Sequence, residues 1–236
     1  MVKSILASLL LLGPVAAISF SSSSESCEDD GHDHGGYGGG GHHGGGNGGG
    51  NGGGNGGQNR GCDAGWRRFD RPSGGWCIRV YSGNIQQASA EAQCKSYGGT
   101  LSSLQNFEEI NYITREALRV MPASSGSVWV GAQRTRACLG QRLTATCTAM
   151  NSFAWTDSSA SGTAGFVWTQ DQPDNAHSRR DQNCVVLLAS ATPTVTTKGV
   201  DWPANHLDDC PCVLNLTEDS PRRVLAYVCG KRARGN

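Results

Sequence analysis

Two segments of the chain carry the apolar spacing of amphipathic helices. The first covers residues 85–97, and Gly98-Gly99 ends it. Its apolar face is predicted at Ile85, Ala88 and Ala92. The second helix begins at Asn106, where Asn-Phe-Glu-Glu is a capping-box pattern with asparagine in place of serine or threonine, and Pro122 lies beyond its end. Its apolar stripe comprises Ile110, Ile113, Ala117 and Leu118.

Runs of aromatic and β-branched residues, which are typical of strands, flank these helices. One precedes the first helix, at 76–81. Four follow the second helix, at 127–132, 153–156, 184–188 and 224–229. Long polar loops separate the later strands, and long loops in compact domains are usually functional or disordered. Two early helices followed by short strands predict an α+β fold.

The residues before 61 lack both periodicities. Residues 1–17 have the order of a secretion signal, with Lys3, a mainly apolar run, Pro14 and a small-residue cleavage site; an ordinary N-terminal helix is the alternative. The following segment has little to bury and is predicted to be disordered. No second long apolar run follows, so the sequence predicts no membrane span. The predicted organisation is a signal peptide at 1–17, a Gly/His/Asn-rich segment at 18–60, a folded domain at 61–230 and a basic tail at 231–236.

Composition narrows the function classes. Formal charge balances to zero, with 20 basic and 20 acidic residues, which argues against a nucleic-acid binder. Neither GxSxG nor HExxH occurs, so we expect no enzyme. The Gly-rich segment could bind zinc or copper, although a soluble spacer is the simpler interpretation. Its candidate ligands are Asp29, Asp30, His32, Asp33, His34, His42 and His43.

All ten cysteines follow the predicted cleavage site. An even number of cysteines in a secreted chain indicates disulfides. Zinc is the competing interpretation, but zinc sites favour CxxC pairs with matching partners, and the closest pair here is Cys210-Pro211-Cys212. We therefore expect disulfide bonds and a secreted, extracellular protein.

Several short motifs, taken in their order and spacing, resemble the C-type lectin-like domain family across residues 62–229. They are CDAGW and GGWC near the start, WVGA at 129–132, FAWTD at 153–157, QPD at 172–174, NC at 183–184, DDCPC at 208–212 and AYVC at 226–229. The Gly-rich spacer and a loop between Cys138 and Cys147 are similar to the secreted group of such proteins in nematodes. The resemblance implies a C-type lectin-like fold with two helices, short antiparallel sheets and long disulfide-anchored loops.

The resemblance also implies the cysteine pairing. The expected bridges are Cys62–Cys77, Cys94–Cys229, Cys138–Cys147 and Cys184–Cys212. Cys27 and Cys210 are left over; they could pair together, or Cys27 could bridge to another chain in an oligomer. Each bridge restricts the unfolded chain and adds about 2–4 kcal/mol of stability.

In this family the peptide bond before the proline of the QPD position is cis, and the residues on both sides of that proline bind one Ca2+ ion. The implied calcium ligands, which are also the implied carbohydrate-binding residues, are Gln172, Asp174, Gln182, Asp208 and Asp209. Gln182 stands where the family usually has an acid, and Asp208 where it has asparagine, so three carboxylates remain. Without a cation these carboxylates would repel one another and raise each other's pKa. Loss of calcium, with Asp208 and Asp209 as solvated loop acids, is the alternative.

The QPD triplet resembles the galactose-preferring members of the family. Galactose binders usually stack an aromatic ring on the sugar, and residues 175–183 contain none. Arg179 and Arg180 could favour anionic glycans, or they could form a solvated loop face. Asn215-Leu216-Thr217 is a glycosylation acceptor.

These observations predict a secreted, calcium-dependent, carbohydrate-binding lectin, with a role in innate immune or surface glycan recognition by analogy alone. One alternative is a calcium-independent C-type lectin-like domain that binds a protein ligand. Another is a structural matrix or mucus component led by the Gly-rich segment.

Overall fold

The computed structural model describes residues 59–177 and 180–235. The predicted signal peptide, the Gly/His/Asn-rich segment up to residue 58, Cys27 and Arg179 lie outside the described residues. The elements are β1 (Arg67–Arg71), β2 (Gly74–Ser82), α1 (Gln87–Ser96), β3 (Thr100–Leu101), α2 (Phe107–Val120), β4 (Ser125–Arg134), a 3-10 turn (Arg136–Cys138), β5 (Phe153–Trp155), β6 (Cys184–Ser190), β7 (Thr194–Thr197), β8 (Val200–Pro203), β9 (Leu207–Cys210) and β10 (Val224–Arg232). The α+β prediction is confirmed, and all five predicted strands are present.

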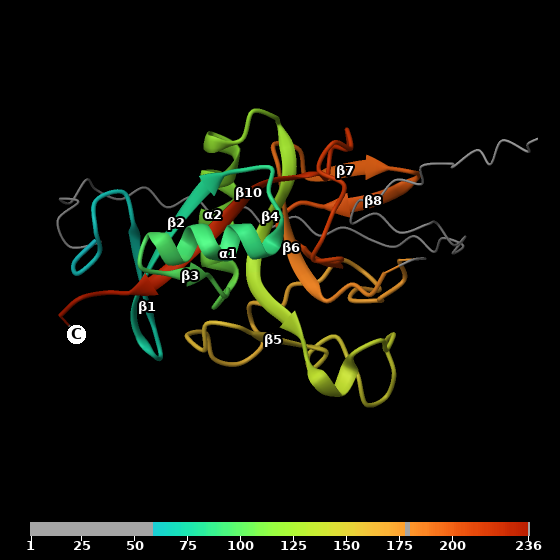
Figure 1. Ribbon diagram of the computed structural model, residues 1–236, viewed down its shortest axis with the longest axis horizontal. Helices are drawn as coiled ribbons and strands as arrows, with labels where there is room; N and C mark the ends of the chain where they lie inside the picture. Colours follow the sequence, from blue (N-terminus) through green and yellow to red (C-terminus); the bar gives the residue numbers. More distant parts are fainter. Residues whose placement is uncertain (1–58, 178–179, 236) are drawn as a thin grey trace, which may run out of the picture.

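One sheet forms the centre of the domain (Figure 1). Its order is β1-β2-β10-β4-β6-β9, with β3 paired to β10 and β5 paired to β4. The β10–β4 pair is parallel, and the other pairs are antiparallel. β7 and β8 form a separate antiparallel hairpin. The strand nearest the C-terminus, β10, therefore lies in the middle of the sheet.

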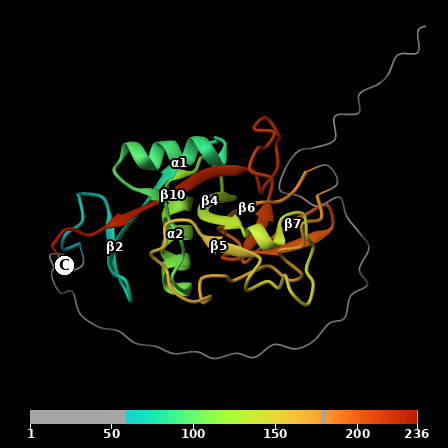
Figure 2. The same ribbon diagram turned by 60° about the horizontal axis from the view of Figure 1, so that its bottom comes forward.

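The two helices cover opposite faces of this sheet, as Figure 2 shows with α1 above β10 and α2 below it. Strand residues alternate between the faces. Val128 and Val130 belong to the apolar core under α2, and Trp129 between them belongs to the core under α1. No helix in the described ranges is long and apolar enough to span a membrane.

The two helix predictions had different outcomes. For α2, Asn106 caps the first turn by accepting a hydrogen bond from the Glu109 amide at 3.1 Å. Its predicted apolar residues Ile110, Ile113 and Ala117 are fully buried. For α1 the predicted face was wrong: Ala88 and Ala92 are exposed. The face that packs on the sheet is Gln87, Ala90 and Cys94, because the Cys94–Cys229 disulfide attaches that side to β10.

Four disulfides close the domain, and all four predicted bridges are confirmed. They are Cys62–Cys77, Cys94–Cys229, Cys138–Cys147 and Cys184–Cys212. The bridge to Cys212 also confirms the register that places Asp208 and Asp209 just ahead of it, on β9.

Candidate functional site

The loop between β5 and β6 carries the Gln172-Pro173-Asp174 triplet. The peptide bond before Pro173 is cis, as expected. Asp171 and Asn175, which bracket the triplet, have φ angles of 64° and 51°. Aspartate and asparagine enter this left-handed region more readily than most residues. The chain therefore turns sharply on both sides of the triplet.

Asp209 fastens this turn to the sheet. It lies on β9 opposite Val185 of β6, and its carboxylate is fully buried. Its Oδ1 accepts a hydrogen bond from the Asp174 amide at 3.2 Å, and its Oδ2 accepts one from the Asn175 amide at 3.1 Å. One carboxylate thus holds two consecutive backbone groups of the loop.

Gln182 closes the same loop from its other end. Its side chain is fully buried. The amide Nε2 donates to the Asp209 carbonyl at 2.8 Å, and Oε1 accepts from the His177 amide at 3.2 Å. The Gln182 backbone N–H donates to Asn175 Oδ1 at 2.7 Å. The Asn175 turn and Gln182 are therefore hydrogen-bonded both to each other and to Asp209 on β9.

Arg134, at the end of β4, lies beneath this arrangement. Its Nη2 forms a fully buried ion pair with Asp209 Oδ2. Its Nε donates to the Gln182 carbonyl at 2.9 Å and its Nη1 to the Gln141 carbonyl at 3.2 Å. The guanidinium also lies over the Phe153 ring, 4.6 Å from its centroid. Burial lowers the pKa of Arg134, while the charges of nearby aspartates, Asp209 first, oppose that shift. A guanidinium keeps its charge under such conditions, so Arg134 is a fixed cation.

Asp174 is the half-buried acid of the triplet. Its Oδ1 accepts from the Ala176 amide at 2.9 Å, and its own amide donates to Gln172 Oε1 at 3.1 Å. Burial raises the pKa of Asp174, and the Ala176 hydrogen bond and the positive charge of Arg142 partly offset the rise. Asp174 thus presents a carboxylate edge beside Asn175, Ala176 and His177, which are all partly exposed.

Asp208 does not join this group. Consecutive residues of a strand point to opposite faces, and Asp208 forms its ion pair with Arg222. The structure therefore brings together four of the five predicted site residues, namely Gln172, Asp174, Gln182 and Asp209.

Comparisons with known proteins identify the family to which this chain belongs. A family model described as "C-type lectin domain-containing protein 141/158" matches residues 69–232 of the chain. This chain belongs to the C-type lectin family. The galactose-specific lectin nattectin of Thalassophryne nattereri is 33% identical over 70 residues, which are 30% of this chain and 41% of nattectin.

Solved structures of C-type lectin domains are similar to the chain at lower identity. The carbohydrate-recognition domain of cow CD23, described in the presence of an oligosaccharide, is 18% identical with a TM-score of 0.48 and covers 74% of this chain and 98% of its own. The carbohydrate-recognition domain of the mouse scavenger receptor C-type lectin is 18% identical with a TM-score of 0.45 and covers 73% of this chain and 99% of its own. The family is thus lectin-type.

C-type lectins often bind Ca2+, so the donor set of this domain was tested against that ion. Calcium takes six to eight oxygens. Here Asp208 points away, and the Asp209 carboxylate is occupied by Arg134 and two backbone amides. Within residues 59–177 and 180–235, no three His, Cys, Asp or Glu side chains are grouped to hold a metal. As arranged, these residues do not fit calcium, because a fully buried guanidinium already supplies the positive charge.

Arg134 and the carbonyl of Gln141 were missed in the sequence. The signal that could have found Arg134 was charge balance, since converging acids require a cation and Arg134 follows closely on the strand predicted at 127–132. Gln141 lies inside the Cys138–Cys147 loop, so this loop borders the site.

The remaining predicted side chains can also be placed. Arg180 donates to the Val213 carbonyl at 2.7 Å. Trp168 packs against the core and stacks with Phe166. Asn215 is exposed.

Proposed function

We propose that this C-type lectin domain binds carbohydrate at the turn after Pro173, through Asp174, Asn175 and His177. We further propose that the Arg134–Asp209 ion pair holds that turn in shape without calcium. The observation that carries the proposal is the buried guanidinium at the centre of the predicted site. Asp209 receives there both the charge and the backbone contacts that fix the loop.

A galactose-type ligand is the first to test. The Gln172-Pro173-Asp174 triplet and the similarity to a galactose-specific lectin support this choice. The Asp174 carboxylate has acceptor positions for a sugar hydroxyl, and Asn175 can donate. The residues that contact the sugar are then Asp174, Asn175 and His177, with Gln172, Gln182 and Asp209 as positioning residues.

Calcium-dependent binding is the second candidate function. It is favoured by the convergence of Gln172, Asp174, Gln182 and Asp209, which are oxygen donors of the kind that calcium prefers. It requires Arg134 to leave Asp209, and Asp208 to leave Arg222 if the fifth predicted ligand is used.

A glycan array with and without a calcium chelator separates the two candidates. We expect galactosides to bind equally well with and without the chelator. Asp174→Ala should abolish these signals, and Asp171→Asn, a change at an exposed acid in the same loop, should not. Signals that vanish with chelator would contradict the guanidinium proposal and support the calcium site. A blank array in both conditions would contradict glycan binding itself and leave a protein ligand as the better hypothesis.

We also propose that the protein is secreted and recognises glycans at a surface, as in innate defence. Four disulfides support an oxidising compartment.

A further inference from the structure

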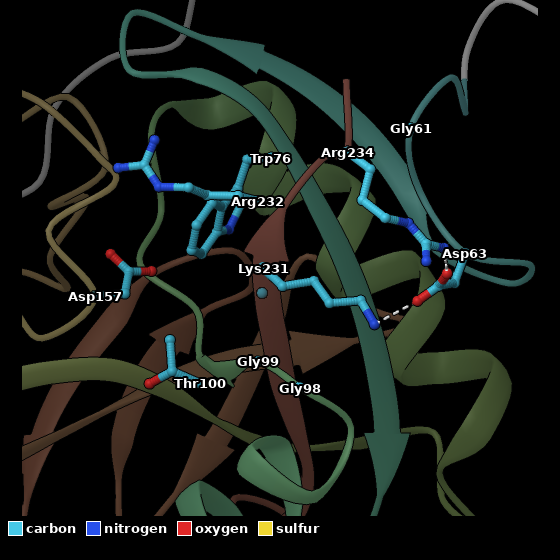
Figure 3. A pocket seen from close by; sticks show the side chains of 11 residues that line it. Gly61, Asp63, Trp76, Gly98, Gly99, Thr100, Asp157, Lys231, Arg232 and Arg234 are labelled. Atoms are coloured by element: carbon cyan, nitrogen blue, oxygen red, sulfur yellow. Dashed lines mark hydrogen bonds and ion pairs between the residues drawn. The ribbon is translucent and has the colours of Figure 1, made fainter. Parts of the chain in front are cut away.

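A cavity of about 530 Å³ opens outside the Pro173 loop. It lies where β2 and the end of β10 meet the segment before β3 (Figure 3). In that view Arg232, Trp76 and Asp157 line one side, and Lys231, Arg234 and Asp63 line the other. None of these residues takes part in the loop site.

Glycines and one indole form the wall of this cavity. A Cβ on Gly230 would lie 2.3 Å from Trp76 Nε1, and a Cβ on Gly99 would lie 2.5 Å from the Gly230 carbonyl oxygen. These positions therefore have no room for side chains. Trp76 is held rigidly, because its Nε1 donates to Ser102 Oγ at 3.0 Å and the Arg71 guanidinium lies over its ring.

Asp157 and Arg232 are oriented but not saturated. Each Asp157 oxygen accepts one backbone N–H, from Ser103 at 2.7 Å and from Ser159 at 2.9 Å. A carboxylate offers about four acceptor positions, so about two stay open. Arg232 is exposed, and within the described part of the chain its one hydrogen bond goes to the Ser73 carbonyl at 3.3 Å. Four of the five N–H groups of a guanidinium then stay available.

The charges of the cavity favour an anion. Lys231 and Arg234 both pair with the single carboxylate of Asp63, with Lys231 at 2.6 Å. Two carboxylates, Asp63 and Asp157, line the cavity. Three cations line it as well, namely Lys231, Arg232 and Arg234. The lining therefore carries a net positive charge, and Arg232 is the cation without an acidic partner among the described residues.

We propose that this cavity binds an acidic saccharide, separately from the loop site. The acidic group would lie on Arg232 and ring hydroxyls would donate to Asp157, beside the largely buried Trp76. Asp157 can only accept and Arg232 can only donate, so the ligand must carry both hydroxyls and an anionic acceptor. Ligand cavities of about 300–1,000 Å³ hold small molecules, and this volume accommodates one or two sugar rings.

Calorimetry on the full chain with two probes tests the proposal. The probes are a hyaluronan disaccharide, which carries one uronate, and neutral lactose. We expect Arg232→Gln to weaken disaccharide binding about tenfold or more, which is the loss of one hydrogen bond to a charged group. Arg115, an exposed arginine on α2, provides the control, and Arg115→Gln should have no effect.

Measuring disaccharide binding in a variant of the loop site distinguishes this proposal from the proposed function. Asp174→Ala should leave disaccharide binding intact, whatever it does to lactose. Added salt should weaken disaccharide binding, because the pairing is partly exposed. Disaccharide affinity that is unchanged in Arg232→Gln, with the variant's melting temperature preserved, would overturn the proposal. Loss of disaccharide binding in Asp174→Ala would also overturn it, since the ligand would then occupy the loop.

Discussion

Arg134 supports the Pro173 loop from inside the protein. Its three hydrogen-bonded partners come from the Cys138–Cys147 loop, from the end of the Pro173 loop and from β9. A buried cation that is fixed to the chain does not depend on the surrounding calcium concentration. Arg134 and Asp209 are both removed from water, so each buried charge is stable only while the other is present.

Removing either charge of this pair should be strongly destabilising. We expect Arg134→Met to lower the free energy of unfolding by about 3–5 kcal/mol, because it leaves the Asp209 carboxylate buried and unpaired. The double variant Arg134→Met with Asp209→Asn should lose less than the sum of the two single losses. Urea unfolding of all four proteins measures this coupling.

The exposed ion pair of Arg119 with Glu116 is the comparison. Arg119→Met should change the unfolding free energy by about 0–1 kcal/mol. Strictly additive losses at Arg134 and Asp209 would show that the pair does not hold the loop.

Asp174 should give the loop a measurable pH dependence. Burial raises the pKa of Asp174 in the folded state above the ordinary 3.8. The folded chain therefore keeps this proton at a higher pH than the unfolded chain, and the charged carboxylate reduces stability once the pH rises above its folded pKa. Asp174→Asn should raise the melting temperature at pH 7, and the gain should shrink as the pH falls to 3.8.

Thermal melts at several pH values test this expectation, with Asp171→Asn as the control for loss of an exposed acid. A gain that grows toward low pH would mean that the sign is wrong.

The Cys138–Cys147 loop is the element that joins the strand core to the proposed carbohydrate-binding loop. It delivers the Gln141 carbonyl to Arg134, and the positive charge of its Arg142 acts on Asp174. We expect replacement of both cysteines by serine to cost about 2–3 kcal/mol of stability, the chain-entropy value for a loop of this length. It should also weaken galactoside binding.

A variant that lacks the Cys62–Cys77 bridge is the control for that experiment. It should lose stability without a change in galactoside affinity, since this bridge closes the β1–β2 end. If both variants lost galactoside affinity equally, the loss would come from general destabilisation of the domain and not from the Cys138–Cys147 loop.

The sequence predicted elements where local pattern and tertiary packing agree. Asn106 and the stripe Ile110–Ile113–Ala117 identified α2 because capping and period are local properties. The short strand β9 escaped prediction, because it contains two adjacent aspartates, a residue type that is rare in strands, and all four of its residues are buried. The site was predicted only in part. The order of the motifs located its oxygen donors. The direction of the Asp208 side chain depends on the pleat of β9, and the partner of Asp209 is Arg134, which the motifs do not include. The prediction of the buried face of α1 was wrong because the Cys94–Cys229 disulfide, and not the spacing of the alanines, decides which side of the helix packs on the sheet.

In the whole domain, the two proposed carbohydrate sites lie at separated places on one chain. Arg232 and Trp76 belong to the paired ends of β10 and β2, and Asp174 belongs to the loop fastened to β9, at the far edge of the same sheet. A single chain could then bridge two different glycans without forming an oligomer, which would raise its avidity on a mixed surface.

The exposed Asn215 is the expected glycosylation site of the secreted protein. We expect the protein from a eukaryotic secretory system to carry an N-linked glycan there, since the acceptor motif lies on the surface. Treatment with a peptide N-glycosidase should increase gel mobility, and Asn215→Gln should match the treated protein. Secreted protein whose mobility does not respond would contradict this expectation.

The central position of β10 has a consequence for biosynthesis. β2 and β4 are made early, yet the strand that joins them, Val224–Arg232, leaves the ribosome after nearly all of the domain. Until then both strands keep open edges, and open edges invite pairing with other chains. We therefore expect a chain truncated before Val224 to aggregate, because β2 and β4 would keep these open edges.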